Sequence, residues 1–427
     1  MCRSWLVFAG LSFATWVHGD ETSPNQGVLG DWGGVRTRLY ESGVDFQLNY
    51  FAEPGYNAQG GTANLLRIAD QWTVAATFDL DKLWSWPKSI FKIVITDRNG
   101  HNLSADANLE TLMQVQEVYG RGNIVRLTEL SYEQVLFDGL VNIKLGRMGV
   151  GGSFDVWSCQ FMNLTFCGEL PGNIVATWYN WPVSQWAARV RVQLNHDMRI
   201  EGGVYQINPS YLEESNGFAL FPPGTIGALV PLEFDWAPQL GSRGLPGRYR
   251  IGGWYDTAQQ PDVFLAENGQ PLVLSPGVPP LTRNGESGFY FNAQQQVTSV
   301  GDYNARGLSV FLNFVAADRN TATISELLNA GIFYNGPFAT RPQDIAGFAI
   351  GRVHVNPRVA QGQMLQNENG GPLVPVQSSE YPIELFYDIK FTKWLSVQPL
   401  VQYVDHPGGT NVYPNVLVIG FNFALTF

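Results

Sequence analysis

The last eleven residues of the chain alternate between apolar side chains and small or less bulky ones, and this pattern limits the fold more than any other feature. Leu417, Ile419, Phe421, Phe423, Leu425 and Phe427 are separated by Val418, Gly420, Asn422, Ala424 and Thr426. A period of two residues indicates a β-strand with one apolar face. The same alternation recurs at 44–50, 72–80, 188–194 and 383–389. The chain is therefore expected to be all-β from Val44 to Phe427.

Two kinds of all-β fold produce such alternation, the soluble sandwich and the transmembrane barrel. Many candidate strands here run about 9 to 12 residues, the length that crosses a bilayer at a tilt, whereas strands in soluble proteins average about 5 or 6. The opposite faces are rich in Arg, Glu, Asn and Gln, as expected for a wet lumen. Charged residues make up only 15% of the chain and aromatic residues 13%. We therefore predict a transmembrane antiparallel β-barrel.

Seventeen segments qualify as candidate strands, although bacterial single-chain barrels have an even number, so about sixteen should form the wall. They are 44–52, 70–80, 90–98, 125–137, 140–147, 174–180, 185–194, 197–206, 228–236, 247–256, 288–297, 307–317, 326–335, 345–353, 381–391, 394–404 and 412–427. The weakest are 174–180 and 228–236. The intervals 99–124, 148–173, 207–227, 257–287 and 354–380 lack alternation and are expected to be loops.

The N-terminus has the composition of an export signal. Arg3 precedes an apolar stretch and the small-residue site Val17-His18-Gly19, so residues 1–19 are predicted to be a signal peptide. Residues 20–43 are expected to form an N-terminal periplasmic segment with a short helix between Leu29 and Ser42, and 44–427 the barrel. Removing residues 1–19 leaves 25 basic and 37 acidic residues (25 − 37 = −12), which argues against nucleic acid as a partner.

The loop 148–173 is the candidate constriction loop because it is long and holds both cysteines of the exported chain. Seven residues separate Cys159 from Cys167, which permits a loop-closing disulfide in an oxidising compartment. Two free thiols are the alternative. With no histidine nearby, no metal site is predicted there.

Alternation along each strand also predicts which side chains face the lumen. With Val141, Ile143 and Leu145 outward, Asn142 and Lys144 face inward; the same logic turns Lys92, Arg98, Ser131, Arg250 and Asp256 inward. The pore-lining candidates are Glu129, Glu133, Lys144, Arg147, Trp157, Arg189, Arg191, Arg199 and Glu201. A lumen of both charge signs suits polar neutral solutes, because carboxylates accept from hydroxyl groups and guanidinium groups donate to them. Opposite charges facing each other would also brace the wall without touching a solute.

Tryptophans offer a second kind of solute contact, through stacking on sugar rings. Interfacial girdles explain most of the set Trp178, Trp181, Trp186, Trp236, Trp254 and Trp394. Trp157 is favoured as a solute contact because it lies in the cysteine-bearing loop. No serine-hydrolase, zinc-protease or nucleotide-binding motif is present, so we predict no catalytic residues, no cofactor and no enzymatic activity.

Several stretches resemble a known family. The opening Leu29-Gly-Asp-Trp-Gly-Gly-Val-Arg-Thr-Arg-Leu-Tyr-Glu-Ser-Gly43 looks like the start of mature carbohydrate-selective porins of the OprB family. Cys159 to Gly168, Asn180-Trp-Pro-Val-Ser-Gln-Trp-Ala-Ala-Arg189 and Gly203-Val-Tyr-Gln-Ile-Asn-Pro209 are similar to that family, as are Arg126-Leu-Thr-Glu-Leu-Ser-Tyr-Glu133 and Ile143-Lys-Leu-Gly-Arg147. The likeness extends in outline from Leu29 to Phe427, while the region 60–125 departs most from the family pattern.

The resemblance implies a sixteen-stranded porin in the bacterial outer membrane that passes monosaccharides, glucose foremost, by diffusion. Its partners would be the lipid bilayer and small neutral sugars, and a homo-oligomer is compatible with it. Two alternatives stay open at this point. One is a porin for other small solutes such as organic acids, and the other is a secreted all-β carbohydrate-binding protein.

Overall fold

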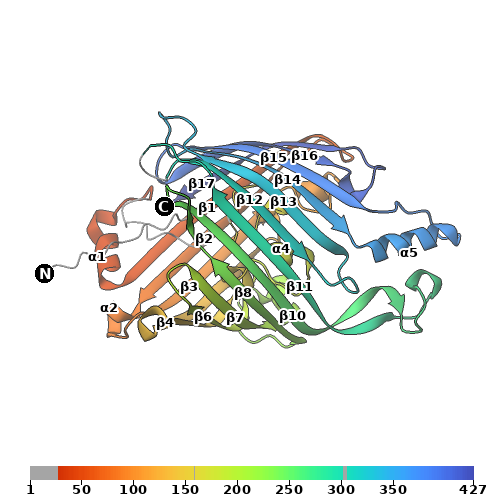
Figure 1. Ribbon diagram of the computed structural model, residues 1–427, viewed down its shortest axis with the longest axis horizontal. Coiled ribbons are helices and arrows are strands. Elements are labelled where there is room, and N and C mark those ends of the chain that lie inside the picture. The colour runs from red at the N-terminus through yellow and green to blue at the C-terminus, as the bar shows by residue number, and fades with distance from the viewer. Residues whose placement is uncertain (1–26, 158, 302–304) are drawn as a thin grey trace.

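The chain closes into an antiparallel β-barrel in the computed structural model, which describes residues 27–157, 159–301 and 305–427 (Figure 1). Consecutive strands pair with each other, and β17 pairs back onto β1. The two-residue β9 (Gln239–Leu240) lies in the turn before β10, so sixteen strands form the wall. Closure leaves no free strand edge, as a barrel in lipid requires. The predicted signal peptide, 1–19, lies outside the described residues.

The wall strands follow one another around the barrel. They are β1 (Val44–Gln59), β2 (Leu66–Asp79), β3 (Ser89–Gly100), β4 (Ile124–Leu136), β5 (Val141–Met148), β6 (Gln185–Gln193), β7 (Met198–Ile207), β8 (Gly227–Trp236), β10 (Leu245–Ala266), β11 (Pro280–Gln296), β12 (Gly307–Ala316), β13 (Ile324–Asn335), β14 (Ile345–Val355), β15 (Ser379–Lys390), β16 (Leu395–Asp405) and β17 (Val416–Thr426). The helices are α1 (Val35–Ser42), α2 (Leu80–Trp84), α3 (Leu103–Asp106), α4 (Leu170–Ile174) and α5 (Pro357–Glu368). None of the helices in the described ranges is long and apolar enough to cross a membrane.

Most of the predicted strands agree with the structure, although β1 continues to Gln59, beyond its predicted end at residue 52. Of the two weakest candidates, 228–236 is a wall strand, β8, while 174–180 belongs to a loop. The interval 257–287 is not all loop, because β10 and β11 continue as a hairpin beyond the barrel. Neither strand of this hairpin has the alternating apolar face of a membrane-spanning strand, so the alternation pattern did not predict it. The loop expected at 354–380 contains α5.

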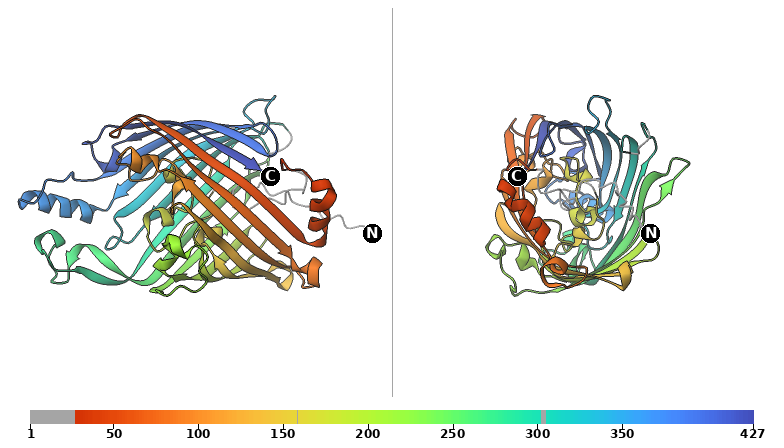
Figure 2. Two further views of the ribbon diagram at one scale, coloured as in Figure 1. Left: turned by 180° about the vertical axis from the view of Figure 1, so that it is seen from behind. Right: turned by 90° about the vertical axis from the view of Figure 1, so that its left-hand side faces the viewer.

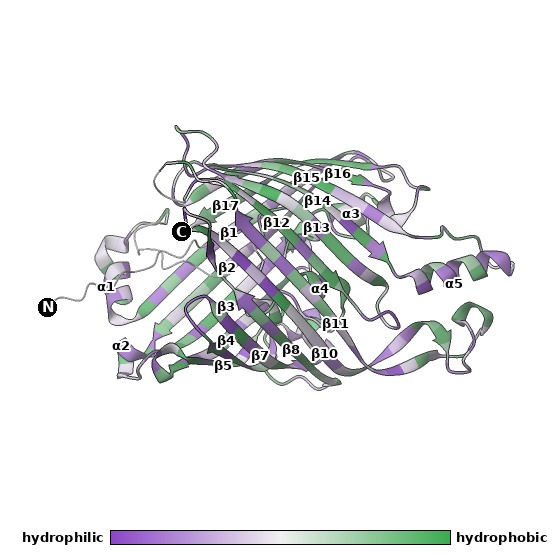
Figure 3. Cartoon of the chain, viewed as in Figure 1, coloured by the Kyte–Doolittle hydropathy of each residue, from purple (hydrophilic) through white to green (hydrophobic). Residues whose placement is uncertain are grey.

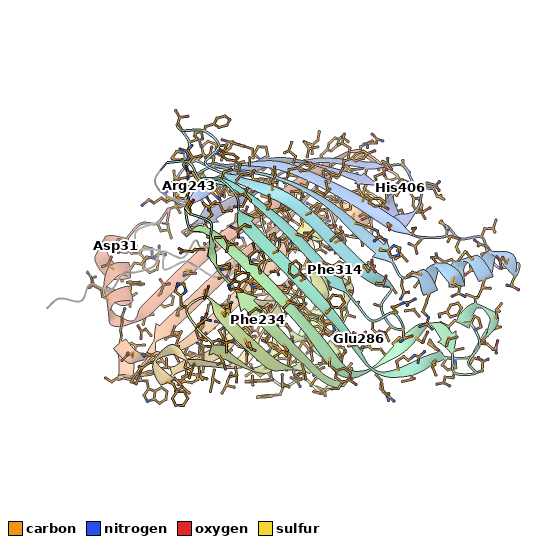
Figure 4. All side chains as sticks on the ribbon, viewed as in Figure 1. Asp31, Phe234, Arg243, Glu286, Phe314 and His406 are labelled. Atoms are coloured by element: carbon orange, nitrogen blue, oxygen red, sulfur yellow. A yellow bond between two sulfur atoms is a disulfide. The ribbon has the colours of Figure 1, made fainter. Side chains whose placement is uncertain are left out.

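Alternation sorts the side chains between lipid and lumen. In β12, Val310 and Leu312 are exposed on the outer face, while Ser309, Phe311 and Asn313 are buried inside. Figure 3 shows the resulting bands of apolar and polar residues along the strands. Figure 4 shows Phe234 and Phe314 on the wall itself, both on the outward-facing side of their strands.

The two ends of the barrel differ. Short turns and the C-terminus lie at one end, with α1 and α2, and the long loops lie at the other, from which α5 and the β10–β11 hairpin project (Figure 1). Asp31 and Arg243 mark the first end in Figure 4, while Glu286 and His406 lie toward the second. Short turns are typical of the periplasmic side and long loops of the extracellular side.

The N-terminal segment holds the last residue of the chain. The buried Arg36 on α1 donates to the Phe427 carbonyl at 3.0 Å and to the Phe46 carbonyl at 3.2 Å. Val28 N–H donates to Thr426 O at 2.9 Å, and a Cβ on Gly27 would collide with the Phe427 backbone. The segment before the barrel thus braces the seam between β1 and β17.

Replacing Arg36 with Ala should lower the stability of the barrel. Both hydrogen bonds of the buried guanidinium would be lost, and hydrogen bonds to a charged group are worth about 1.5–3 kcal/mol each. Thermal unfolding of the protein in detergent measures the effect. Arg38→Ala is the matched control, since Arg38 is exposed on the same helix, and equal unfolding temperatures for the two variants would contradict a bracing role.

Candidate functional site in the barrel lumen

Two long loops fold into the barrel instead of staying outside it. They are the β3–β4 loop (101–123) and the β5–β6 loop (149–184), drawn orange to yellow within the ring in the end-on view of Figure 2. A backbone removed from water must find partners for its N–H groups. Carboxylates on the inner wall supply several of them.

Glu384 of β15 is fully buried and accepts from two successive backbone groups, Met162 N–H at 2.9 Å and Asn163 N–H at 2.8 Å. Glu380, on the same strand, accepts from Leu112 N–H at 2.7 Å. One strand therefore holds both loops.

Other parts of the wall provide further anchors. Glu53 of β1 accepts from Val118 N–H at 3.0 Å. Glu233 of β8 accepts from Asp155 N–H at 2.7 Å, and burial and the charge of Glu233 raise the pKa of the Asp155 carboxyl well above its usual range. The loops are thus tied to three sides of the barrel.

A disulfide joins Cys159 to Cys167 within the β5–β6 loop. Of the two alternatives that the sequence left open, the structure has the bonded pair. Glu117 lies close to both sulfur atoms, and these three residues are the one group of possible metal ligands in the described ranges. Because both sulfurs are used in the disulfide, they are not available as thiolate ligands.

Apolar packing fills one side of the lumen. Phe161 lies 5.0 Å from the Phe386 ring and 5.5 Å from the Phe333 ring, both of which face inward from the wall. Trp157 lies 5.0 Å from Phe311 and is only 7% exposed. The lumen is therefore not wet throughout, since the β5–β6 loop is packed against the β12–β15 wall through aromatic rings.

The remaining space narrows to a cavity of about 290 Å³ between the two loops and the β1–β3 wall. Its polar and aromatic lining includes Phe51, Gln71, Arg98, Gln114, Glu117, Arg121, Trp157, Glu169, Asn173, Asn180 and Trp181. Two guanidinium groups, two carboxyl groups and several amides thus converge on one narrow space. Such a lining can bind a polar solute from several sides.

The wall and the loops share hydrogen bonds at this cavity. Arg98 donates to the Gln71 side-chain oxygen at 2.7 Å and to the Gly120 carbonyl at 2.6 Å. The Trp181 indole N–H donates to the same Gln71 oxygen at 3.1 Å. These bonds hold the Arg98 fork and the Trp181 ring in place before any solute arrives.

Burial shifts the pKa values of the ionisable residues in the two loops. It raises the pKa of the Glu169 carboxyl to about 7, with Glu117 acting in the same direction and Arg98 and Arg121 opposing it. Burial also raises the pKa of Glu117, against the opposing effect of Arg98, and lowers the pKa of Arg121. The net charge of the cavity therefore changes near neutral pH, chiefly through Glu169.

A second, smaller cavity continues from the first. Glu169 and Trp181 line both cavities, and Glu129 and Lys144 line the second. Lys144 Nζ lies 2.6 Å from a Glu129 oxygen, and Lys92 pairs with the other oxygen at 3.6 Å. The first cavity thus adjoins the charged side of the wall.

Opposite charges alternate along this side from β3 to β10. Arg189 lies 3.6 Å from Glu133 and 3.8 Å from Glu201, and Arg191 pairs with Glu201 at 2.9 Å. The row then continues through Asp235 and its arginine neighbours. Asp235 is 2.6 Å from Arg199, 2.7 Å from Arg248 and 3.4 Å from Arg250.

The structure places most of the predicted pore-lining residues in this charged row, on the inner face. Arg147 is an exception, because it shares the outward-facing side of β5 with Leu145. Its guanidinium stacks on Tyr211 at 4.4 Å and donates to the Ser184 carbonyl at 2.9 Å. Arg147 thus holds the loop that follows β7. Trp157 reaches the cavity with one edge while its ring packs among phenylalanines.

Sequence reasoning missed Glu117, Arg121, Glu169 and Trp181 as site residues. All four lie in loops, where no alternation assigns a direction to a side chain. The interfacial-girdle interpretation is wrong for Trp181, and also for Trp178 and Trp254, which are buried inside the barrel. Arg98 was expected to face inward, but the sequence did not predict that it lines this cavity.

Comparison with known proteins shows which family shares this architecture. The model of the carbohydrate-selective porin, OprB family, matches residues 63–427. Porin B of Pseudomonas aeruginosa is 42% identical over 420 residues, covering 95% of this chain and 92% of that protein. The high-pH structure of Pseudomonas putida OprB superposes with a TM-score of 0.91 at 40% identity, covering 95% of this chain and 99% of that one. These matches and the closed barrel exclude the secreted carbohydrate-binding alternative.

Replacing Glu384 with Gln should loosen the β5–β6 loop. The amide keeps one acceptor oxygen but faces the second backbone N–H with an NH2 group, so one bond to a charged acceptor, worth about 1.5–3 kcal/mol, is lost. Single-channel recordings should show a larger mean conductance and more current noise than the wild type. Glu368→Gln, at the exposed end of α5, is the control, and identical traces for the two variants would argue against anchoring.

Ion selectivity should change with pH through Glu169. Its raised pKa of about 7 means that the carboxyl becomes neutral as the pH falls below 7, leaving Arg98 and Arg121 less compensated. Anion preference, measured from reversal potentials in a salt gradient, should therefore rise between about pH 8 and about pH 6. Glu169→Gln should show the acidic behaviour at every pH, and an unchanged pH profile in this variant would refute the assignment.

Proposed function

Because this chain belongs to the OprB family of carbohydrate-selective porins of the bacterial outer membrane, we propose that its pore passes monosaccharides of the glucose type by passive diffusion. The family makes the protein a channel and not an enzyme. The finer choice of solute rests on the chemistry of the cavity between the two loops and the β1–β3 wall.

The observation that carries the proposal is the mixed lining of the 290 Å³ cavity. Small-molecule sites are typically about 300–1,000 Å³, so this space has room for one small solute at a time. Arg98 and Arg121 can donate to sugar oxygens, while Glu117 and Glu169 can accept from sugar hydroxyls. Both charge signs are present, so neither cations nor anions are favoured as strongly as in a ring of one sign.

Trp181 adds an apolar surface to this polar lining. A pyranose ring has hydroxyl groups at its edge and C–H bonds on its face, so an aromatic side chain can pack against the face while charged groups bind the edge. The indole N–H of Trp181 is already bonded to Gln71. Its ring orientation is therefore set by the protein, which limits the entropy lost when a solute binds.

The hydrogen bonds would replace the hydration of the sugar as it enters. Conduction needs binding that is strong enough to attract the solute and weak enough to release it, and several sites in series meet this need. Glu169 and Trp181 also border a pocket of about 20 Å³, beside the Glu129–Lys144 pair, which has room for a water molecule and not for a sugar. Side chains would have to move there before a sugar could pass along the row of Arg189, Glu201 and their neighbours to the periplasm.

A second candidate solute is a small organic acid. The observation in its favour is the pair of guanidinium groups, Arg98 and Arg121, in the cavity, since guanidinium binds carboxylate with two parallel hydrogen bonds. The buried carboxyl groups Glu117 and Glu169 weigh against it while they are ionised.

Swelling of liposomes that contain the purified protein tests the proposal. Glucose should enter faster than a disaccharide, an amino acid or a salt, and Arg121→Ala should reduce this discrimination by about tenfold if one charge-assisted bond of about 1.4 kcal/mol is lost. Lys393→Ala, in an exposed periplasmic turn, should behave as the wild type. Equal rates for all solutes would refute selectivity, and a clear preference for carboxylates would favour the organic-acid porin.

A further inference from the structure

Basic side chains of the membrane-spanning strands face the lumen almost without exception. Among the described wall residues, Arg147 and Arg352 are the two arginines on the outward-facing side. Arg147 is buried beneath the loop that follows β7. Arg352 is not covered in this way, and its side chain is 38% exposed. An uncovered cation on the outer face of a barrel needs a reason, because charges facing lipid are costly away from the interface.

Arg352 belongs to a small group of polar residues on β13, β14 and β15. It donates to the Ser379 hydroxyl at 3.1 Å and lies 3.4 Å from a Glu326 oxygen. The His354 Nδ1 is 2.8 Å from the same Ser379 oxygen. We use the name outer rim cluster for four residues: Glu326, Arg352, His354 and, in the adjacent β12–β13 loop, Arg319. Two arginines against one glutamate give it a net positive charge.

A groove of about 540 Å³ opens beside this cluster on the outer face of the barrel. Small residues, Ser287, Gly288 and Ala316, leave the space, and the exposed Phe289 forms an apolar side. His354, Glu326 and Arg319 form its polar side. The groove lies at the foot of α5, whose first residue, Pro357, also lines it, at the extracellular end of the barrel in Figure 1.

The outward-facing positions on the periplasmic side of the cluster are apolar. Leu328 pairs directly with Arg352, and Ile350 and Phe348 lie two and four residues before Arg352 on β14, toward the membrane centre; all three apolar side chains are exposed. Phe289 contacts Phe314 at 5.7 Å below the groove. The cluster therefore marks the height at which the hydrocarbon band ends and the headgroups of the outer leaflet begin.

We propose that the groove binds a phosphate-bearing glycolipid of the outer leaflet. Arg319, which lines the groove, would contact the phosphate, since guanidinium forms paired, charge-assisted hydrogen bonds with phosphate oxygens. Arg352 does not line the groove but lies 3.4 Å from Glu326, which does, so it would add positive charge at the edge of the site. One acyl chain would lie over Ala316 and along Phe289 toward the apolar band. This site is distinct from the solute path, because the groove and the cluster face away from the lumen.

Titration of the purified protein in detergent with diphosphoryl lipid A tests the site. The lipid should raise the unfolding temperature in a saturable way, because a ligand that binds the folded state stabilises it. Arg319→Gln/Arg352→Gln should weaken binding by about tenfold or more, and Lys393→Gln, at the periplasmic end, should bind as the wild type. Dephosphorylated lipid A and inorganic phosphate should each give little or no shift.

Unchanged lipid A binding by the double variant would overturn the proposal. So would an equal shift with the dephosphorylated lipid or with inorganic phosphate alone. Arg319→Gln by itself alters only an exposed loop residue and keeps the test usable if the double variant is unstable. Glucose swelling rates should be the same for all of these variants, so failure of the lipid site and failure of the sugar proposal are distinguishable.

Discussion

Hydrogen bonds from backbone N–H groups to wall carboxylates are the interaction on which the inside of this barrel depends. A barrel of sixteen strands leaves a wide lumen, and a loop inside it loses contact with water. Glu384, Glu380, Glu53 and Glu233 accept from the two inward loops at 2.7 to 3.0 Å. Leaving those N–H groups without partners would cost about 1–3 kcal/mol each. The carboxylates therefore make it possible for loops to narrow the pore.

With the loops anchored in this way, the two sides of the lumen differ in the residues that line them. On the β12–β15 side, Phe161 and its neighbours fill the space between loop and wall. On the β3–β10 side, alternating Arg, Lys, Glu and Asp pair with one another along the wall. The β5–β6 loop also covers part of this side, where Phe154 packs on Tyr205 and Trp178 on Trp254. The narrowing between the two sides is the point at which Arg98 faces the charged residues of both loops.

The different surroundings of the two faces of the wall also explain why charged residues are common on the inner face and rare on the outer face. Inside, most cations have a carboxylate neighbour, which reduces the cost of removing them from water, while Arg98 and Arg126 donate to carbonyl and amide oxygens. Outside, the strands present apolar side chains to lipid, and the exposed charges lie only where the extracellular rim begins. The inner face is thus suited to water and the outer face to lipid, although inward and outward residues alternate along the same strands.

The sequence by itself determined the barrel, the strand positions and the orientation of most wall residues. Alternation is a local property, so the apolar rows of β17 and the inward positions of Glu129, Lys144 and Arg189 could be predicted from neighbouring residues. The tertiary structure alone decided which residues form the narrowing. Glu169 lies in a loop without periodicity, and the loop's position depends on contacts such as Met162 with Glu384, 222 residues apart. Such distant pairing follows from closure of the barrel, which no local pattern encodes.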